Sequence, residues 1–418
     1  MEQRLERTLG VSDAVVVGLG AMVGAGIFAA LAPAAGAAGA GLPAALAVAA
    51  VVAYCNAHSS ARLAARHPSS GGTYVYGREQ LGPFWGYLAG WGFVVGKTAS
   101  CAAMALTVGA YLWPAQRHAV AVAAVVALTA ASYGGVRKSA RIARLIVAAV
   151  LAVLAGVVVV CLTSEAAGSG WPGGGERVGA AGLLQGAGLL FFAFAGYARI
   201  TTLGEEVRDP ERTIPRAVPI ALGIALLVYA AVTVAVLSVL GVQALAGSAA
   251  PLADAVGAAG RPGLAPVVRV GAALAALGSL LALVLGVSRT TLAMARDGHL
   301  PRALAAVHPR HRAPHHAELA VGAVVAVLAA TTDLRGAIGF SSFGVLVYYA
   351  IANVSAWTLG SGVKGRAVAA VGLSGCVLLA CALPLASVGA GAAVLALGAL
   401  VYGLRARLGP GGRSRVGS

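Results

Sequence analysis

The chain has 418 residues, of which 59% are hydrophobic and 11% are charged, and its mean hydropathy is +0.86. A soluble domain has roughly 45–50% apolar and about 25% charged residues, so this composition excludes a soluble globular protein and indicates an integral membrane protein. The formal net charge of +16 raises the possibility of a nucleic-acid partner, which depends on where the charges lie.

The apolar runs are about 20 residues long and use Leu, Val, Ala and Gly without strict alternation, as spanning helices do and barrel strands do not. The stretch before the first run contains Glu2, Arg4, Glu6 and Arg7 and has no clear processing site, so we do not expect a cleaved signal peptide. We predict about twelve spans, at 12–33, 42–65, 84–113, 117–135, 141–163, 181–204, 215–241, 264–292, 316–332, 335–358, 364–382 and 384–404.

Most of the 30 lysine and arginine residues flank the predicted spans on one side. This asymmetry follows the positive-inside rule and predicts that both termini are cytoplasmic. The basic charge therefore indicates topology and contact with membrane lipid, and we expect no nucleic-acid partner. All five cysteines lie in apolar runs without metal-ligand spacing, so we expect neither a metal nor a cofactor.

The first apolar run, Val17 to Gly41, contains several helix breakers, and Gly20, Gly24 and Gly26 gather near its middle. An unwound segment there would leave backbone groups unpaired in hydrocarbon unless it lined a cavity or bound something. A dinucleotide fingerprint would need a preceding strand and a later acidic residue, which are missing. Close helix packing remains an alternative for any single glycine.

The sixth run has a similar interruption at Gly196, after an aromatic stretch in "LLFFAFAGYARI". Discontinuous helices at corresponding positions of two halves are typical of secondary transporters built from inverted repeats. Such a break directs N–H groups at an anion and frees carbonyls for a cation, so the pair of breaks matches a zwitterionic amino acid.

Three segments together resemble the amino acid/polyamine/organocation (APC) superfamily of permeases: "GAMVGAGIF" (Gly20 to Phe28), "FFAFAGY…GEEVRDPERTIPRA" (Phe191 to Ala217) and "SRTTLAMARDGHLPRALAAVHPRHRAPHHA" (Ser288 to Ala317). The resemblance implies an all-α polytopic membrane protein with a leucine-transporter-type 5+5 inverted repeat and discontinuous helices 1 and 6. The implied units are a first repeat at 1–163, a second at 181–358, two appended helices at 364–404 and a cytoplasmic tail at 405–418.

The same resemblance implies where a substrate binds. Its carboxylate would meet backbone donors at Val23, Gly24, Ala25 and Gly26. Its amino group would meet carbonyls of Ala21, Met22, Phe192, Ala193 and Ala195. Phe194 and Tyr197 would form an aromatic gate or side-chain pocket, with a core aromatic as the alternative for Phe194.

Proton-coupled members of the superfamily carry a lysine in the fifth helix, where this chain has an apolar residue near Val150. Two cations remain within spans, Lys97 and Arg199, and such charges usually face a cavity or a partner. We hypothesise that Lys97 replaces the missing lysine in coupling, and we expect Glu205 to lie too far along the helix to pair with Arg199. Ser288 with first-helix carbonyls is the alternative, a sodium site.

The sequence thus predicts a multi-pass transporter of the plasma membrane that moves an amino acid together with a coupling proton, and the two cations within spans favour a neutral amino acid. An amino acid exchanger and a non-transporting sensor remain the alternatives. An HExxH motif, a serine elbow and paired carboxylates within a span are missing, so we expect no enzyme and no catalytic residue. The histidines His308, His311, His315 and His316 are interpreted as a solvated loop.

Overall fold

The structure is a computed structural model and describes residues 9–24, 26–68, 71–133, 140–170, 179–204, 206–308, 314–360 and 362–408. Over these residues the fold is helical, apart from one isolated parallel bridge between Leu9 and Val207. Ten helical segments are long and apolar enough to cross a membrane, and two shorter apolar helices accompany them. These findings confirm an all-helical, polytopic membrane protein.

The longer helices follow the predicted spans in chain order. They are α1 (Val11–Met22), α2 (Gly26–Ala38), α3 (Leu42–Arg66), α5 (Pro83–Leu112), α6 (Arg117–Tyr133), α7 (Ala140–Leu162), α8 (Ala180–Phe194), α10 (Pro210–Gly247), α12 (Ala265–Arg296), α13 (His315–Thr331), α14 (Leu334–Trp357), α15 (Gly362–Ala382) and α16 (Leu385–Leu408). The first predicted span is divided between α1 and α2. The sixth is divided between α8, the 3₁₀ turn η3 (Ala195–Tyr197) and the single-turn helix α9 (Ala198–Thr201).

Two short helices, α4 (Thr73–Leu81) and α11 (Pro251–Ala258), lie outside the predicted spans. Both are shorter than a span and lie in connections, where a search for 20-residue apolar runs passes over them. The helix α10 begins five residues earlier than the predicted span 215–241, because Pro210 occupies its first turn. Proline is tolerated there since the first N–H groups of a helix have no intrahelical partner.

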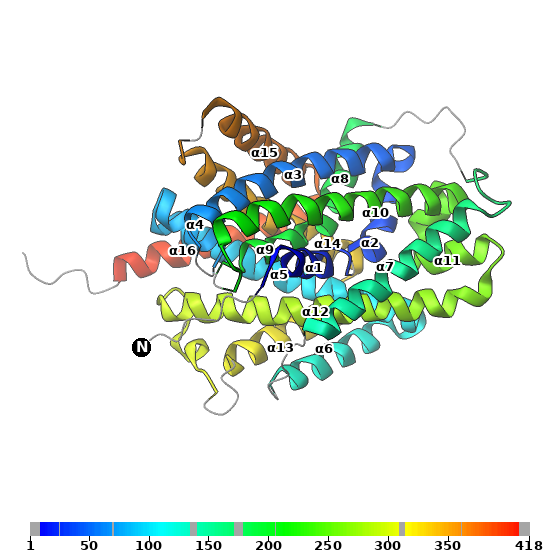
Figure 1. The fold of residues 1–418 in the computed structure, drawn as a ribbon. Coiled ribbons are helices and arrows are strands. Elements are labelled where there is room, and N and C mark those ends of the chain that lie inside the picture. Colours follow the sequence, from blue (N-terminus) through cyan, green and yellow to red (C-terminus); the bar gives the residue numbers. More distant parts are fainter. Residues whose placement is uncertain are drawn as a thin grey trace, which may run out of the picture.

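The helices differ strongly in how much of their surface other helices cover. In the most apolar 18-residue stretch of α5, 83% is buried by other helices, whereas in that of α16 17% is buried. Figure 1 shows α1 and α9 in the middle of the bundle, with α15 and α16 at its edge. A helix that is apolar all round and packed on one side presents its other side to lipid, so α5 belongs to the core and α16 to the lipid boundary.

The two interrupted helices cross each other at their breaks. A Cβ placed on Gly26 would lie 2.6 Å from the Cα of Ala193, and a Cβ on Gly196 would overlap the backbone of Ala21 and Met22. Each break therefore has a glycine that makes room for the backbone of the other. This mutual approach holds the two discontinuities at the same depth in the bundle.

We predict that Gly26→Ala destabilises the protein by about 1–3 kcal/mol, the usual cost of forcing extra volume into a packed interior. The matched control is Gly223→Ala on α10, where a Cβ meets nothing within 4 Å and helix propensity favours alanine. The measurement is the thermal unfolding midpoint of each purified variant in the same detergent. Equal midpoints for the two variants would show that the breaks do not need this contact.

Candidate functional site

A cavity of about 440 Å³ lies directly beside the crossed breaks. Its inner wall contains Ala21 from the first break and Phe192 and Ala195 from the second, together with Lys97 and Met104 of α5. The facing wall is a stripe of α12 at helical spacing, formed by Ser279, Ala282, Leu283, Gly286, Val287, Arg289, Thr290 and Ala293. The cavity therefore lies between the interrupted helices, α5 and α12, where a mid-bundle solute site is expected.

The cavity extends toward one end of the bundle, which we call the basic end because α3 ends there at Arg66 and α12 at Arg296. Gly71, Tyr74 and Glu206 line it on that side.

The opposite end is closed around Tyr111, which is fully buried. The Tyr111 hydroxyl donates to the carbonyl of Phe28 at 3.2 Å and accepts from the amide of Leu252 at 3.5 Å, while Arg269 Nη1 donates to the Tyr111 carbonyl at 3.0 Å. The rings of Phe28 and Tyr111 also meet edge to face. These contacts join α2, α5, α11 and α12 above the breaks, so the cavity has a sealed end and a basic end.

The backbone donors predicted to bind a carboxylate that the structure describes, at Val23, Gly24 and Gly26, are buried and do not line the cavity, which meets the first break at Ala21. The N–H of Val23 donates to the carbonyl of Leu19 at 2.7 Å and so ends α1. Gly24 lies against the side chain of Ser279, whose hydroxyl donates to the carbonyl of Gly20 at 3.2 Å. Gly26 opens α2, where the first N–H groups of a helix have no intrahelical acceptor. Ala25 lies outside the described residues.

Tyr229 of α10 ties the two breaks together. Its hydroxyl lies 2.6 Å from the carbonyl oxygen of Met22 and 3.0 Å from that of Ala193, and its side chain is fully buried. Its ring also packs edge to face on Phe194. Because this hydroxyl carries one proton, two of the carbonyls predicted to accept a substrate ammonium share a single donor of the protein.

A third predicted acceptor, the carbonyl of Ala195, has two donors. Lys97 Nζ lies 3.3 Å from this oxygen and the Tyr349 hydroxyl 3.4 Å from it. The Lys97 side chain is 6% exposed, and in the described part of the chain it has no carboxylate partner. Lys97 thus reaches from α5 to the break of the sixth span.

The aromatic residues of the sixth span divide into two groups. Phe192 lines the cavity. Phe194 and Tyr197 are fully buried away from it, and Tyr197 stacks on Tyr349 with ring centroids 5.1 Å apart. In this conformation Phe192 is the aromatic residue of the break that a solute in the cavity would touch.

The cavity carries more positive than negative charge. Lys97, Arg199 and Arg289 line it, with Glu206 as the one carboxylate among its described lining residues. Arg199 donates to the hydroxyl of Thr202 at 3.2 Å, and its Nη2 lies 4.0 Å from Glu206 Oε1. Its acidic neighbour is thus Glu206; Glu205 lies outside the described residues.

Two alternative coupling sites follow from the sequence, the fifth-helix position near Val150 and Ser288, and their surroundings differ. The side chain of Val147 on α7 faces Gly20, with Cγ2 3.1 Å from where a Cβ of that glycine would lie, so an apolar group stands beside the first break. Ser288 is fully buried, does not line the cavity, and its hydroxyl has no hydrogen-bond partner among the described residues. The hydroxyl that reaches a first-helix carbonyl is that of Ser279.

A polar cluster stands at the mouth of the cavity. Tyr74 of α4 donates to Asp297, and the same carboxylate lies 3.2 Å from Arg78 Nη1. The Tyr74 oxygen is also 3.0 Å from His299 Nδ1. Because the single hydroxyl proton is directed at Asp297, Nδ1 of His299 must carry the proton of the second bond.

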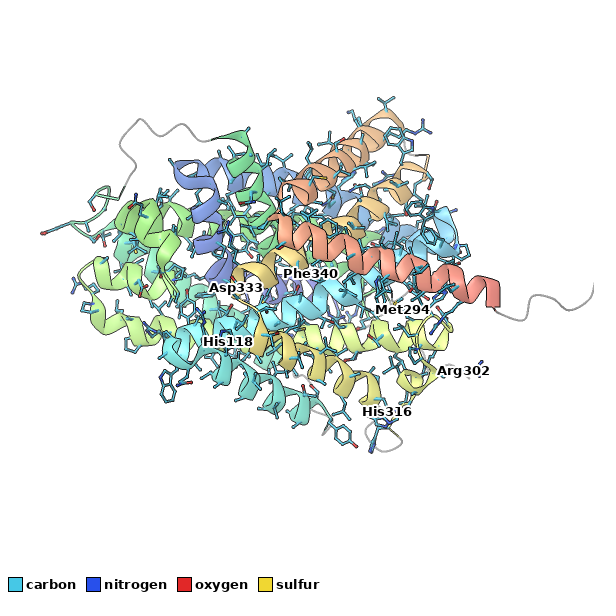
Figure 2. The ribbon with its side chains drawn as sticks, turned by 180° about the vertical axis from the view of Figure 1, so that it is seen from behind. His118, Met294, Arg302, His316, Asp333 and Phe340 are labelled. Carbon is cyan, nitrogen blue, oxygen red and sulfur yellow. The ribbon has the colours of Figure 1, made fainter. Side chains whose placement is uncertain are left out.

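The cluster connects three parts of the fold. Arg405 of α16 donates to the carbonyl of Gly298 at 2.9 Å, so the last helix is attached to the end of α12. Figure 2 shows Met294 near this end of α12 beneath α16, and Met294 packs in one cluster with Tyr74 and Tyr87. Burial lowers the pKa of His299, with Arg78 and Arg405 adding to this effect and Asp297 opposing it.

Two interrupted helices that cross beside a solute-sized cavity, inside a polytopic apolar bundle, are typical of membrane proteins that bind a small solute at mid-bundle. A family model described as amino acid permease matches residues 9–403, and the chain belongs to this family. The prediction of an APC-superfamily amino acid permease is therefore confirmed, and the family consists of transporters.

The chain is similar to several curated proteins. An uncharacterized transporter of Mycobacterium tuberculosis strain H37Rv is 71% identical over 403 residues, which are 96% of this chain and 92% of that protein. The branched-chain amino acid permease BcaP of Bacillus subtilis is 26% identical, covering 85% of this chain and 81% of the permease. Cationic amino acid transporter 4 of Homo sapiens is 29% identical, covering 85% and 60% of the two chains.

We predict that His299 makes the protein less stable in acid. Since its pKa is lowered in the folded state, the unfolded chain binds more protons between that value and the ordinary histidine pKa, and stability falls as the pH falls through this window. The variant His299→Asn keeps an N–H near Nδ1 but does not titrate, so its unfolding midpoint should fall less on acidification.

The measurement compares unfolding midpoints at about pH 7.5 and about pH 5.5, on either side of the ordinary histidine pKa. The control is His316→Asn, because His316 lies at the edge of the same end of the bundle, away from the cluster. An equal acid-induced decrease in wild type and His299→Asn would refute the role of this histidine.

Proposed function

We propose that the protein is a secondary active transporter that moves a neutral amino acid across the plasma membrane by alternating access, coupled to protons. The observation that carries the proposal is the asymmetric cavity, which touches both breaks, extends to the basic end and is sealed around Tyr111 at the other end. The positive-inside rule assigns the basic end and both termini to the cytoplasm, so this arrangement corresponds to an inward-facing state.

We further propose the inverted-repeat layout, with repeats at 1–163 and 181–358 and appended helices at 364–404. The reciprocal contacts of the breaks support it: Gly26 of the first meets Ala193 of the second, while Gly196 of the second meets Ala21 of the first. Exchanging the two breaks reproduces the same kind of contact, as a pseudo-two-fold axis between repeats requires.

The charge of the cavity supports a neutral rather than a cationic substrate. Three cations and one carboxylate line it, and a cationic side chain would be repelled at close range in a site of low dielectric. Phe93, Met104, Phe192 and Leu283 supply apolar surface for an aliphatic side chain. The name of the Bacillus relative, a branched-chain amino acid permease, agrees with this substrate class. The substrate carboxylate is assigned to backbone N–H groups of the first break, at Val23, Gly24, Ala25 and Gly26.

For coupling, we propose Lys97 as the residue that gains and loses the proton. It is buried, lines the cavity and contacts the second break, whereas Val147 and Val150 on α7 supply apolar side chains near the position of the family lysine. Exchange of amino acids, solute sensing without transport, and a sodium site at Ser288 are the competing mechanisms, and each gives a different result in the following experiment.

The test is uptake of labelled amino acids into proteoliposomes containing the purified protein, in sodium-free buffer, with and without an inward proton gradient. We expect accumulation of leucine that collapses when a protonophore is added. Accumulation that requires internal unlabelled amino acid indicates an exchanger, accumulation that requires sodium indicates a sodium site, and binding without movement indicates a sensor. Uptake by the variant Lys97→Ala should no longer depend on pH. Uptake by this variant with an unchanged pH profile would exclude Lys97 from coupling.

We predict that Tyr111→Phe weakens the sealed end. The substitution removes the bonds to Phe28 and Leu252 and keeps the ring contact, and each such bond contributes about 1 kcal/mol, which corresponds to about fivefold in an equilibrium. Of the two bonds, the one to Leu252 attaches α11, so hydrogen–deuterium exchange of the peptide containing α11 should be about fivefold faster. Tyr54→Phe, at an exposed residue of α3, is the control. Unchanged exchange in Tyr111→Phe would show that the hydroxyl does not hold this end closed.

A further inference from the structure

The carbonyl of Ala195 in the second break already has two donors of the protein, and those of Ala193 in the second break and Met22 in the first share a third donor. The carbonyl of Ala195 accepts from Lys97 and Tyr349. The single proton of the Tyr229 hydroxyl is shared between the carbonyls of Met22 and Ala193. A carbonyl oxygen has two lone pairs, so two donors saturate that of Ala195. A second ammonium could bind there only after Lys97 had left.

Displacing Lys97 is unfavourable for electrostatic reasons. Its side chain is 6% exposed, and its described hydrogen-bond acceptor is the Ala195 carbonyl. An ammonium that loses its acceptor in a buried site bears the cost of desolvation without compensation. The incoming ammonium would also approach a like charge in a cavity already lined by Arg199 and Arg289.

We infer that the Lys97 ammonium takes the place of the substrate's own ammonium at the second break, so that this protein recognises carboxylates with a neutral side chain whether or not they carry an amino group. The site then needs only a carboxylate from the substrate. The N–H groups at the start of α2 bind this carboxylate, and the protein itself contributes the cation, Lys97. The inference rests on the proposed function and narrows its substrate class.

The alternative occupant beside Lys97 is an acidic side chain of the substrate. The hydrogen bond of the lysine argues against this, because its ammonium donates to the backbone of the break. An acidic amino acid would still have to place its own ammonium at carbonyls that already have donors. This alternative is one outcome of the test.

The experiment measures how analogues of leucine inhibit uptake of labelled leucine by wild-type proteoliposomes. The analogues are 4-methylpentanoate, which lacks the amino group, 3-methylbutylamine, which lacks the carboxylate, and glutamate. We expect the half-inhibitory concentration of 4-methylpentanoate to lie within about threefold of that of unlabelled leucine. The reason is that the ammonium of leucine adds less than one charge-assisted hydrogen bond. The amine and glutamate should inhibit at least about tenfold more weakly.

Variants then assign the effect to Lys97. In Lys97→Met the Ala195 carbonyl loses its charged donor, so the ammonium of leucine gains an acceptor and 4-methylpentanoate should become at least about tenfold weaker than leucine. Lys97→Arg, which keeps the charge, should preserve the wild-type ratio. The matched control is Arg296→Met, which removes an exposed cation of α12 that does not line the cavity and should also preserve the ratio.

The outcomes separate this inference from the proposed function. If leucine is transported but 4-methylpentanoate inhibits more than about tenfold more weakly in wild type, the inference is wrong and the amino acid transporter stands. If glutamate is the strongest inhibitor, Lys97 pairs with a substrate side chain and the inference is likewise wrong. If no amino acid is transported, bound or exchanged, the proposed function itself fails. The wild-type comparison decides the inference even if Lys97→Met does not fold.

Discussion

The structure depends on one constraint: a helix interrupted inside a membrane must find partners for the backbone groups that the interruption frees. The chain meets it by crossing its two interruptions and by directing side chains of neighbouring helices at their carbonyls. The single proton of the Tyr229 hydroxyl is shared by one carbonyl from each break, and Lys97 and Tyr349 donate to a third carbonyl. The helices α5, α10 and α14 are therefore positioned by polar contacts as well as by packing, and the cavity lies where these contacts meet.

The same arrangement explains why a charged lysine is found in a core helix. A buried cation is costly unless it is paired or hydrogen-bonded, and Lys97 obtains an acceptor from an unwound backbone instead of from a carboxylate. The other cavity cations lie nearer the mouth, where Arg199 has Glu206 nearby and Arg289 is exposed. Positive charge therefore lines the cavity from its mouth to the break, with a carboxylate near the mouth.

Much of the fold followed from the sequence because its signals are local. Runs of about 20 apolar residues define spanning helices, and the glycine cluster around Gly24 and the single Gly196 after an aromatic stretch predicted both interruptions. The short helices α4 and α11 were not predicted because they carry no such run. The amino acid permease family was predicted correctly from three short motifs, which the family match over residues 9–403 confirms.

The details of the site were harder to predict because they depend on contacts between residues far apart in the chain. Tyr229 lies 207 positions from Met22, and nothing in the sequence near either residue indicates that they meet. Ser279, rather than Ser288, reaches the first break because helical spacing along α12 turns it toward α1. Glu206 and Arg289 were likewise missed as cavity residues, since the side of a helix that faces a cavity is set by packing.

The hydroxyl of Tyr229 has a consequence for the return step of a carrier that works as proposed. When the carbonyls of a binding site have only the substrate as partner, the unloaded protein must carry unpaired polar groups through the occluded state, and this penalty restricts it to one-for-one exchange. Here side chains of the protein already serve those carbonyls. The unloaded protein then crosses the membrane-occluded state without that penalty, which favours net flux over obligatory exchange.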